Sequence, residues 1–253
     1  MMSPTLFISH GSPALMLEAT PSREFLAKFA GRLGNPRGIV CISAHWETED
    51  VAVGLAAAPA TIHDFSGFPA ELYQKRYSAP GDPALGNRVL SLLHTAGITA
   101  TGDSNRGFDH GVWSPLSLIF PDATVPVVEV SVQPHLDAAH HLAAGRALAS
   151  LRDEDILIVG SGSATHNLRD LGRAVPHATA FEAWLCDAVT DGCIDDLVNA
   201  EQRAPAFARN HPTPEHFLPL FAPLGAAGSS AKGEVLNRHF EYGSLSMAAF
   251  LWT

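Results

Sequence analysis

The sequence contains little cysteine, few charged residues and no long apolar run. Its three cysteines, Cys41, Cys186 and Cys193, have no metal-ligand spacing, and we interpret them as buried thiols of a reducing compartment. The spacing of the second and third predicts that they share one face of a helix. No apolar run approaches the roughly 20 residues that a membrane span requires, and the N-terminus lacks the pattern of a signal peptide. We therefore expect a cytoplasmic protein that does not insert into a membrane.

Positive charge is scarce as well. The chain has 26 acidic residues against 16 basic ones, for a formal net charge of -10 at pH 7. Nucleic acids and anionic membrane surfaces attract proteins through basic patches. We therefore expect neither of them as a partner. A small acidic substrate would need a local positive charge, from a metal ion or from a few arginines.

Length and patterning favour one domain of the α/β class. The chain has 253 residues, of which 46% are hydrophobic, and this suits a single core spanning residues 1–253. Predicted strands alternate with predicted helices along the chain. We predict a single three-layer domain with a central, mostly parallel but mixed sheet and helices on both faces. In such folds the active site lies at the carboxyl ends of the strands.

The expected elements follow from apolar periodicity and from turn and capping signals. One helix is expected to open at Pro214, with Thr213 as its cap and His216 in its first turn. Residues 102–112 are expected to form a polar loop. Further strands are expected at 6–8, 38–44, 51–58, 98–101, 125–132, 234–242 and 245–251, and further helices at 21–33, 136–151 and 178–192, with another ending near 96.

Three predicted buried strands each lead into a histidine. The run Leu6–Ile8 is followed by His10, the run 38–44 by His45, and the run that begins at Ile156 by His166. Because the carboxyl ends of neighbouring parallel strands meet in one crevice, these imidazoles are expected to lie together. Neutral imidazoles are the commonest metal ligands. The same rule would also select His135 after the strand at 125–132, although it lies near the start of a predicted helix.

Five motifs, in order along nearly the whole chain, resemble one known family. They are Ser9–Pro13, Ser43–Trp46, His63–Pro69, Asp109–Trp113 and His211–His216. Together they resemble the class III extradiol ring-cleaving dioxygenases, in the branch that includes 4,5-DOPA dioxygenase. The motifs are specific for the family, but they are much less specific for its substrate.

The resemblance implies a role for several histidines. It implies metal ligands at His10, His45 and His216, with Glu215 beside the third position. More distant ring-cleaving relatives use two histidines and a glutamate, so the two neighbouring residues are alternatives for the third ligand. His166 falls at the position of the family's acid/base histidine. His110 falls where a second active-site histidine helps to bind substrate or oxygen, and we group both as catalytic.

A further group of residues is expected to bind substrate or to support the site. The apolar loop at 61–69 is expected to cover a substrate ring, or alternatively to be pinned to the core through its phenylalanines. Arg106 is a candidate partner for a carboxylate on the substrate. The expected substrate-binding residues are Ser12, His63, Asp64, Phe65 and His211.

The resemblance implies a non-haem Fe(II) enzyme that inserts both atoms of O2 into a catechol with a DOPA-like or related side chain. The product would be a muconic semialdehyde. Because three imidazoles bind zinc more tightly than Fe(II), purified protein is expected to carry Zn(II). Two alternatives stay open: a zinc-dependent hydrolase on the same scaffold, and a non-catalytic member that binds metal or a phenol. The sequence also leaves open whether the chain forms a homo-oligomer.

Overall fold

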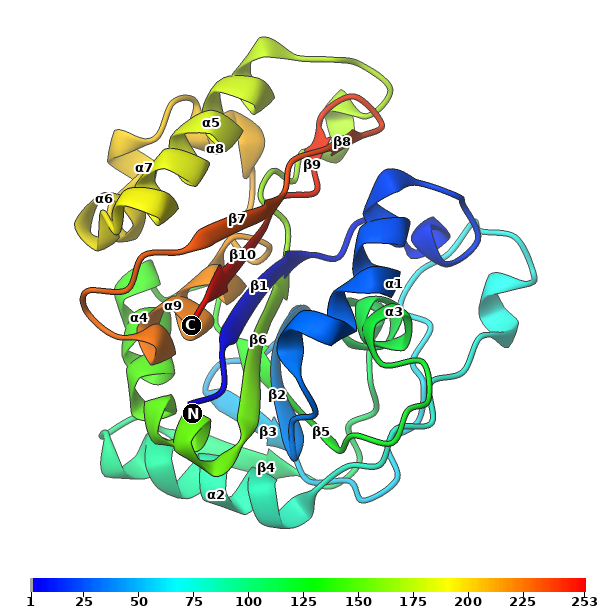
Figure 1. Ribbon diagram of the computed structural model, residues 1–253, viewed down its shortest axis with the longest axis vertical. Coiled ribbons are helices and arrows are strands. Elements are labelled where there is room, and N and C mark those ends of the chain that lie inside the picture. The colour runs from blue at the N-terminus through cyan, green and yellow to red at the C-terminus, as the bar shows by residue number, and fades with distance from the viewer. Residues whose placement is uncertain (1) are drawn as a thin grey trace.

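One mixed sheet of eight strands runs through the centre of the molecule (Figure 1). The structure is a computed structural model, and it describes residues 2–253. The order of strands across the sheet is β4-β3-β5-β2-β6-β1-β10-β7. Two further strands, β8 (Phe240–Glu241) and β9 (Leu245–Ser246), pair with each other. The sheet strands are β1 (Thr5–Ser9), β2 (Gly38–Glu47), β3 (Val51–Gly54), β4 (Ala100–Asp103), β5 (Val127–Val132), β6 (Ile156–Gly162), β7 (Glu234–Asn237) and β10 (Ala249–Trp252).

The middle of the sheet is parallel and its borders are not. Strands β5, β2, β6 and β1 are neighbours and run in the same direction. On one border β10 is antiparallel to β1, and on the other β3 is antiparallel to β5. The carboxyl ends of the four central strands therefore share one edge of the sheet. This confirms the predicted α/β class with a mostly parallel, mixed sheet.

Helices cover both faces because the central strands are apolar on both. Leu6 and Ile8 pack into the core beneath α1 and α3, whereas Phe7 between them packs on the opposite face. That opposite face is covered by α2, α4, α5 and α9. Parallel strands buried on two sides have near-continuous apolar sequences, which is the pattern that predicted them. The helices are α1 (Pro21–Leu33), α2 (Pro83–Thr95), α3 (His110–Ile119), α4 (Ala138–Ala147), α5 (Pro176–Asp191), α6 (Ile194–Val198), α7 (Ala200–Arg203), α8 (Phe207–Asn210) and α9 (Phe221–Ala227).

The predicted helix start at Pro214 is wrong. The backbone N–H groups of Phe217 and Leu218 both donate to the Pro214 carbonyl, at 2.9 and 3.1 Å, but this makes a single turn. The His216 carbonyl accepts instead from the Ser163 N–H, at 2.8 Å, and Pro219 has no N–H to extend the ladder. A short 3-10 helix at Leu218–Leu220 follows, and α9 begins only at Phe221. His216 thus lies in a turn that is bonded across the end of β6.

Other element boundaries also differ from those expected. Strand β2 continues through His45 to Glu47, so this histidine lies in the last residues of the strand, not beyond it. The strand expected at 51–58 ends at Gly54, and helix α3 begins at His110 inside the expected polar loop. Gly192, at φ 74°, ends α5, so Cys193 lies outside that helix and is only half-buried.

The two long strands expected at the C-terminus are each divided into two. The pieces nearer the turn, β8 and β9, leave the main sheet as a separate hairpin, while β7 and β10 remain in it. The expected tight turn at Gly243 is present, with Tyr242 at φ 49° and Gly243 at φ 80°. Thr165, which follows β6, bonds the hairpin to the end of that strand, because its hydroxyl donates to the Ser244 carbonyl at 2.8 Å.

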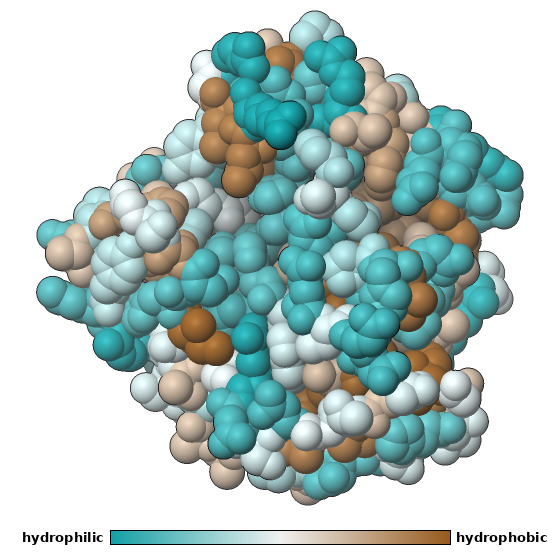
Figure 2. Space-filling model, turned by 180° about the vertical axis from the view of Figure 1, so that it is seen from behind, coloured by the Kyte–Doolittle hydropathy of each residue, from teal (hydrophilic) through white to brown (hydrophobic). Residues whose placement is uncertain are grey.

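The face seen from behind is mainly hydrophilic, with hydrophobic residues in small separate patches (Figure 2). Scattered apolar residues of this kind are normal on a protein surface. Within residues 2–253, no helix is both long and apolar enough to cross a membrane.

Gly162 is expected to be essential to packing at the end of β6. A Cβ atom there would overlap the His216 carbonyl oxygen, which is backbone and has little freedom to move. We expect Gly162→Ala to destabilise the protein by about 1–3 kcal/mol, as overpacking does. The measurement is the melting temperature, which falls by about 2–4 °C per kcal/mol in a chain of this size.

Gly31→Ala is the matched control for this substitution. Gly31 lies on the exposed side of α1, and nothing stands within 4 Å of a Cβ placed there. Alanine has the higher helix propensity, so this variant should gain about 0.5–1 kcal/mol. Equal melting temperatures for the two variants would contradict the packing argument.

Candidate active site

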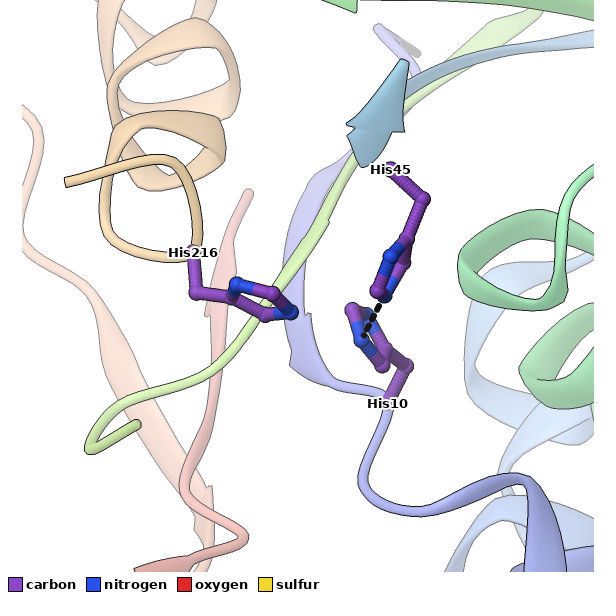
Figure 3. A group of neighbouring side chains, drawn as sticks. All are labelled: His10, His45 and His216. Atoms are coloured by element: carbon purple, nitrogen blue, oxygen red, sulfur yellow. Dashed lines mark hydrogen bonds between the residues drawn. The ribbon is translucent and has the colours of Figure 1, made fainter. Parts of the chain in front are cut away.

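Three histidines from three distant parts of the chain converge at the carboxyl ends of the central strands (Figure 3). His10 directly follows β1, His45 lies near the end of β2, and His216 lies in the turn over the end of β6. Their ring centroids are 4.8 to 5.3 Å apart. One nitrogen from each lies within 4.8 Å of the others. The three imidazoles therefore form a cluster with the dimensions of a metal site.

A buried serine determines which nitrogen of His10 carries the proton. The Ser161 hydroxyl donates to the Gly111 carbonyl, so its only hydrogen is used there. The His10 Nδ1, 3.0 Å from the same hydroxyl oxygen, must then be the donor in their hydrogen bond. His10 Nε2 is left with a lone pair that faces the cluster.

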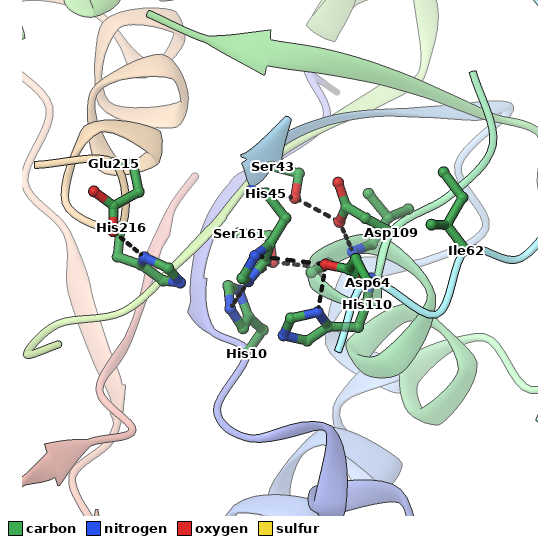
Figure 4. Close-up of polar contacts among 12 residues, drawn as sticks. His10, Ser43, His45, Ile62, Asp64, Asp109, His110, Ser161, Glu215 and His216 are labelled. Carbon is green, nitrogen blue, oxygen red and sulfur yellow. Dashed lines mark hydrogen bonds and ion pairs between the residues drawn. The ribbon is translucent and has the colours of Figure 1, made fainter. Parts of the chain in front are cut away.

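Carboxylates lie beside the Nδ1 atoms of the other two imidazoles (Figure 4). His216 Nδ1 donates to Glu215 Oε1 at 2.8 Å, and His216 Nε2 is buried without a hydrogen-bond partner. His45 Nδ1 lies 3.6 Å from Asp64 Oδ2. Because both carboxylates contact Nδ1 atoms on the outer side of the rings, we interpret them as orienting groups and not as ligands. Glu215 forms a second possible metal-holding group with His166 and His216, but its bond to His216 Nδ1 favours the orienting role.

The cluster fits a divalent metal ion. His45 Nε2 lies 3.0 Å from His10 Nε2, so a hydrogen on His45 bridges the two nitrogens, and a divalent cation bound by both would replace that hydrogen. Burial, together with the neighbouring histidines, holds the pKa of His10 and of His216 well below the usual value and lowers that of His45 to about 4. All three are therefore neutral near pH 7, as ligands must be. Three protein ligands leave positions open for other molecules.

His110 stands beside the cluster and is held by Asp64. Its backbone N–H donates to Asp64 Oδ1 at 2.9 Å and its Nδ1 to Asp64 Oδ2 at 2.7 Å. Burial opposes ionisation of this carboxyl, but the hydrogen bonds and charge of His110 outweigh it and lower the pKa of Asp64 to about 2. The ring of His110 lies 3.9 Å from that of His45, centroid to centroid. Its Nε2 is the nitrogen left available to a bound molecule.

His166 lies on the opposite side of the cluster. Its ring stacks on that of His216 with 3.4 Å between centroids and 10° between planes. Its backbone N–H donates to the Asn210 carbonyl at 2.8 Å, and its Nδ1 lies 3.9 Å from Glu215 Oε1. Burial lowers the pKa of this imidazole, and the charge of Glu215 opposes that effect only in part. His166 is thus a neutral imidazole at the side of the histidine cluster.

The five histidines line one cavity of about 790 Å³. Its walls are mainly apolar, and they include Phe65 and Phe68 from the loop that was expected to cover a substrate ring. Ser12 lines the cavity as well. The volume lies within the range of ligand pockets, which are typically about 300–1,000 Å³ and apolar with a few convergent polar groups.

Comparisons with known proteins agree with this geometry. Residues 4–251 match the family described as the catalytic LigB subunit of aromatic ring-opening dioxygenase. A protein of Beta vulgaris named 4,5-DOPA dioxygenase extradiol is 43% identical, over 98% of this chain and 96% of its own. A protein of Escherichia coli (strain K12) with the same name is 41% identical, over 96% and 92% of the two chains. The crystal structure of an uncharacterized protein from Escherichia coli K12 superposes with a TM-score of 0.82 and 35% identity, over 98% of this chain and 99% of that one.

This chain belongs to the LigB family of extradiol ring-opening dioxygenases. The family resemblance predicted from the motifs is confirmed, and so is the expectation of an oxidoreductase. The match also favours ring opening over the zinc hydrolase and the non-catalytic binder that the sequence left open.

Two histidines expected to bind substrate in this dioxygenase lie outside the cavity wall. His63 Nε2 is 3.1 Å from the Lys75 carbonyl, and its ring packs against Phe65. His211 Nε2 is 3.0 Å from the Ala164 carbonyl, in the loop that carries His166. Burial lowers the pKa of His211 to about 4, so the neutral ring donates this hydrogen bond. Their contacts support the wall and the loop of the site.

A buried charge network beneath His45 corrects the expectation for Arg106. The guanidinium donates to Asp109 Oδ2 at 2.6 Å and to Glu129 Oε1 at 2.9 Å, and it does not line the cavity. Asp109 also accepts from the Ser43 hydroxyl at 2.7 Å, and that hydroxyl oxygen accepts the N–H of His45 at 3.2 Å. Arg106 is therefore occupied in positioning the strand end that carries His45, and it is not free for a substrate carboxylate.

Sequence reasoning missed Ser161, Ser43 and Glu129 as supports of the site. Each lies on a central strand among apolar residues, and a polar side chain inside such a run is the signal that marks it, although Ser43 also opens the Ser43–Trp46 motif. That signal indicates a buried hydrogen bond but not its partner. The partners are His10 after β1, Arg106 and Asp109 before α3, and Gly111 within α3, so only the folded chain identifies them.

Ser161→Ala is expected to weaken metal binding. The substitution leaves the Nδ1 hydrogen of His10 without a partner, so the ring loses the bond that sets its tautomer and orientation. Loss of such a supporting partner typically costs about 10–100-fold in metal affinity. The measurement is calorimetric titration of metal-free protein with Zn(II).

Ser131→Ala serves as the matched control. Ser131 is also buried on a central strand, and its hydroxyl accepts the Ala52 N–H at 2.8 Å, but it does not line the cavity. This variant should lose stability and keep its metal affinity. If both variants bind Zn(II) as tightly as the parent protein, the role given to Ser161 is wrong.

Proposed function

We propose that the protein is an Fe(II)-dependent dioxygenase that opens the ring of a catechol with a DOPA-like or related side chain, giving a muconic semialdehyde. The observation that carries the proposal is the convergence of three neutral imidazole lone pairs with two further histidines in one apolar cavity. The curated relatives from Beta vulgaris and Escherichia coli, both named 4,5-DOPA dioxygenase extradiol, support the choice of a dihydroxyphenyl substrate.

His10, His45 and His216 would hold the metal ion. When bound, Fe(II) makes the catechol hydroxyls more acidic and allows electron density to pass from the ring to O2. The three imidazoles keep their orientation through Ser161, Asp64 and Glu215, so their geometry is set before any ligand arrives. Because such a donor set prefers Zn(II) to Fe(II), protein purified in air is expected to contain zinc.

His166 would act as the acid/base residue. It lines the cavity and is neutral near pH 7, so it can accept a proton from a catechol hydroxyl and return it later in the reaction. Glu215, 3.9 Å from its Nδ1, stabilises the imidazolium that forms. The stacking on His216 holds the ring flat against the cluster and so keeps its nitrogens at a constant distance from the reacting atoms.

His110 would bind the substrate or oxygen from the other side. With Nδ1 held by Asp64, its Nε2 is the atom that meets a ligand, and the carboxylate stabilises positive charge on the ring. Phe65, whose ring lies 5.7 Å from that of His110, would contact the aromatic ring, and Ser12 would contact a polar group of the substrate. The apolar walls exclude bulk water from the reacting atoms.

The proposal is tested by anaerobic loading of metal-free protein with Fe(II), followed by an oxygen electrode assay with L-DOPA, caffeate and protocatechuate. We expect oxygen uptake and a yellow product with at least one of them. In His166→Gln, turnover should fall about 10²–10⁴-fold, which is the usual contribution of general acid–base catalysis, while iron content stays the same.

His135→Gln is the control variant for this assay. His135 also follows a central strand, but it is 45% exposed and lies 3.8 Å from Glu49, away from the cavity. It should retain parental activity. Absence of uptake with all three catechols, in protein shown to hold iron, would overturn the proposed function and favour a hydrolase.

A further inference from the structure

Four residues from three segments form the mouth of the cavity. Leu168 and Leu171 lie in the loop after His166, Tyr242 lies at the tip of the β8–β9 hairpin, and Glu18 follows the first 3-10 helix. The first three are among the most exposed large apolar side chains of the protein, at 62%, 40% and 38%, and Glu18 is exposed as well. We call these four residues the mouth, because they both line the cavity and meet solvent.

The mouth is bonded to the loop that carries His166. The Gly172 N–H donates to the Tyr242 carbonyl at 2.7 Å. Farther along the hairpin, Thr165 bonds to both Ser244 and Ser246, at 2.8 and 2.7 Å. These bonds hold the hairpin tip in a constant position relative to the acid/base histidine. A substrate whose ring lies at the metal cluster would therefore have its side chain directed toward a preformed opening.

Glu18 is the carboxylate that lines this opening. The Tyr242 hydroxyl donates to Glu18 Oε2 at 2.8 Å, and burial with this contact raises the pKa of Tyr242 to about 12, so the phenol stays neutral. Among the described residues that line the cavity there is no lysine or arginine. Arg173 in the neighbouring loop is occupied by Asp170, at 2.9 Å. Arg169, between Leu168 and Leu171, is exposed but does not line the cavity. Inside the cavity wall a substrate carboxylate therefore meets no arginine or lysine, whereas an ammonium group meets Glu18.

The cavity has room for such a side chain. Its volume of about 790 Å³ is roughly five times the ~150 Å³ that accommodates a benzene ring. The leucines of the mouth offer apolar surface to methylene groups, and the second carboxylate oxygen of Glu18 remains available next to the one bonded to Tyr242. Apolar leucine side chains followed by the Glu18 carboxylate complement a substrate side chain made of methylene groups that end in an ammonium group.

We propose that Glu18 is a specificity-determining residue that selects catechols whose side chain carries an ammonium group over those whose side chain ends in a carboxylate alone. This inference rests on the proposed function of the same cavity. If the substrate has an amino acid side chain, we expect its ammonium group to lie toward Glu18. We also expect an added carboxylate on that side chain to contribute no binding affinity.

Three catechols of similar size test this proposal: dopamine, 4-ethylcatechol and 3-(3,4-dihydroxyphenyl)propionate. For the Fe(II) protein we expect kcat/KM to decrease in that order, and anaerobic dissociation constants from equilibrium dialysis to increase in the same order. Glu18 is exposed and therefore screened, so the effect of its charge is modest. Glu18→Gln should reduce the ratio of dopamine to propionate kcat/KM about tenfold, and Glu18→Lys should reverse the preference.

Glu49→Gln is the matched control, because it removes the same charge from a side chain that is 90% exposed and outside the cavity. It should leave the ratio unchanged. A parental preference for the propionate, or an unchanged ratio in Glu18→Gln, would overturn the inference even if every catechol is cleaved. If none is cleaved, the proposed function fails, and the anaerobic dissociation constants still decide whether Glu18 selects the ammonium group.

Discussion

The structure of the site depends on one constraint: each of three buried imidazoles must present an unprotonated Nε2 to a common point. A free imidazole exchanges its proton between two nitrogens, so this arrangement requires a partner for every Nδ1. Ser161 and Glu215 hydrogen-bond to two of these Nδ1 atoms, and Asp64 lies 3.6 Å from the third. Ser161 and Asp64 are themselves held by contacts with Gly111 and His110. Burial keeps the rings neutral, and neutrality is what makes them ligands and not cations that repel one another.

The sheet provides the rigidity that this constraint demands. His10 and His45 lie at the ends of β1 and β2, which flank β6, so their separation follows from the spacing of strands. His216 has no strand of its own. It reaches the cluster because Gly160 and Gly162 let the 216–219 segment lie directly on β6, where any Cβ would overlap a backbone carbonyl. His216 is thus placed by close backbone packing.

A larger network of buried charged side chains lies under His45. The buried group of Arg106, Asp109 and Glu129 connects β2, β5 and the start of α3, and Asp109 also caps that helix through the Val112 N–H. Burial and the charge of Asp109 raise the pKa of Glu129 well above its usual value, so the group does not behave as two free carboxylates. Charged residues are therefore used inside this fold to hold a neutral ligand in place.

Much of the fold and part of the site were predictable from local pattern. The apolar runs identified the central strands, and the position of histidines at their ends indicated a cluster at one edge of the sheet. The sequence pattern could not exclude His135 from the histidine cluster, because its position depends on how the chain turns after β5. There the Gln133 N–H bonds to His141, and His135 lies near Glu49 on the surface. The pattern also misjudged Arg106, whose partners lie on other elements.

By itself, the sequence determined the class of the fold, the family and the residues able to carry the chemistry, because these follow from periodicity and from motifs that are local in the chain. Only the tertiary structure decided which of those residues face one cavity, which nitrogen of each ring is free, and what charge surrounds the opening. Those properties arise from contacts between residues that can be more than two hundred positions apart, such as Glu18 with Tyr242. Side-chain type does not encode such contacts, because the packing of strands and helices sets the distances between them.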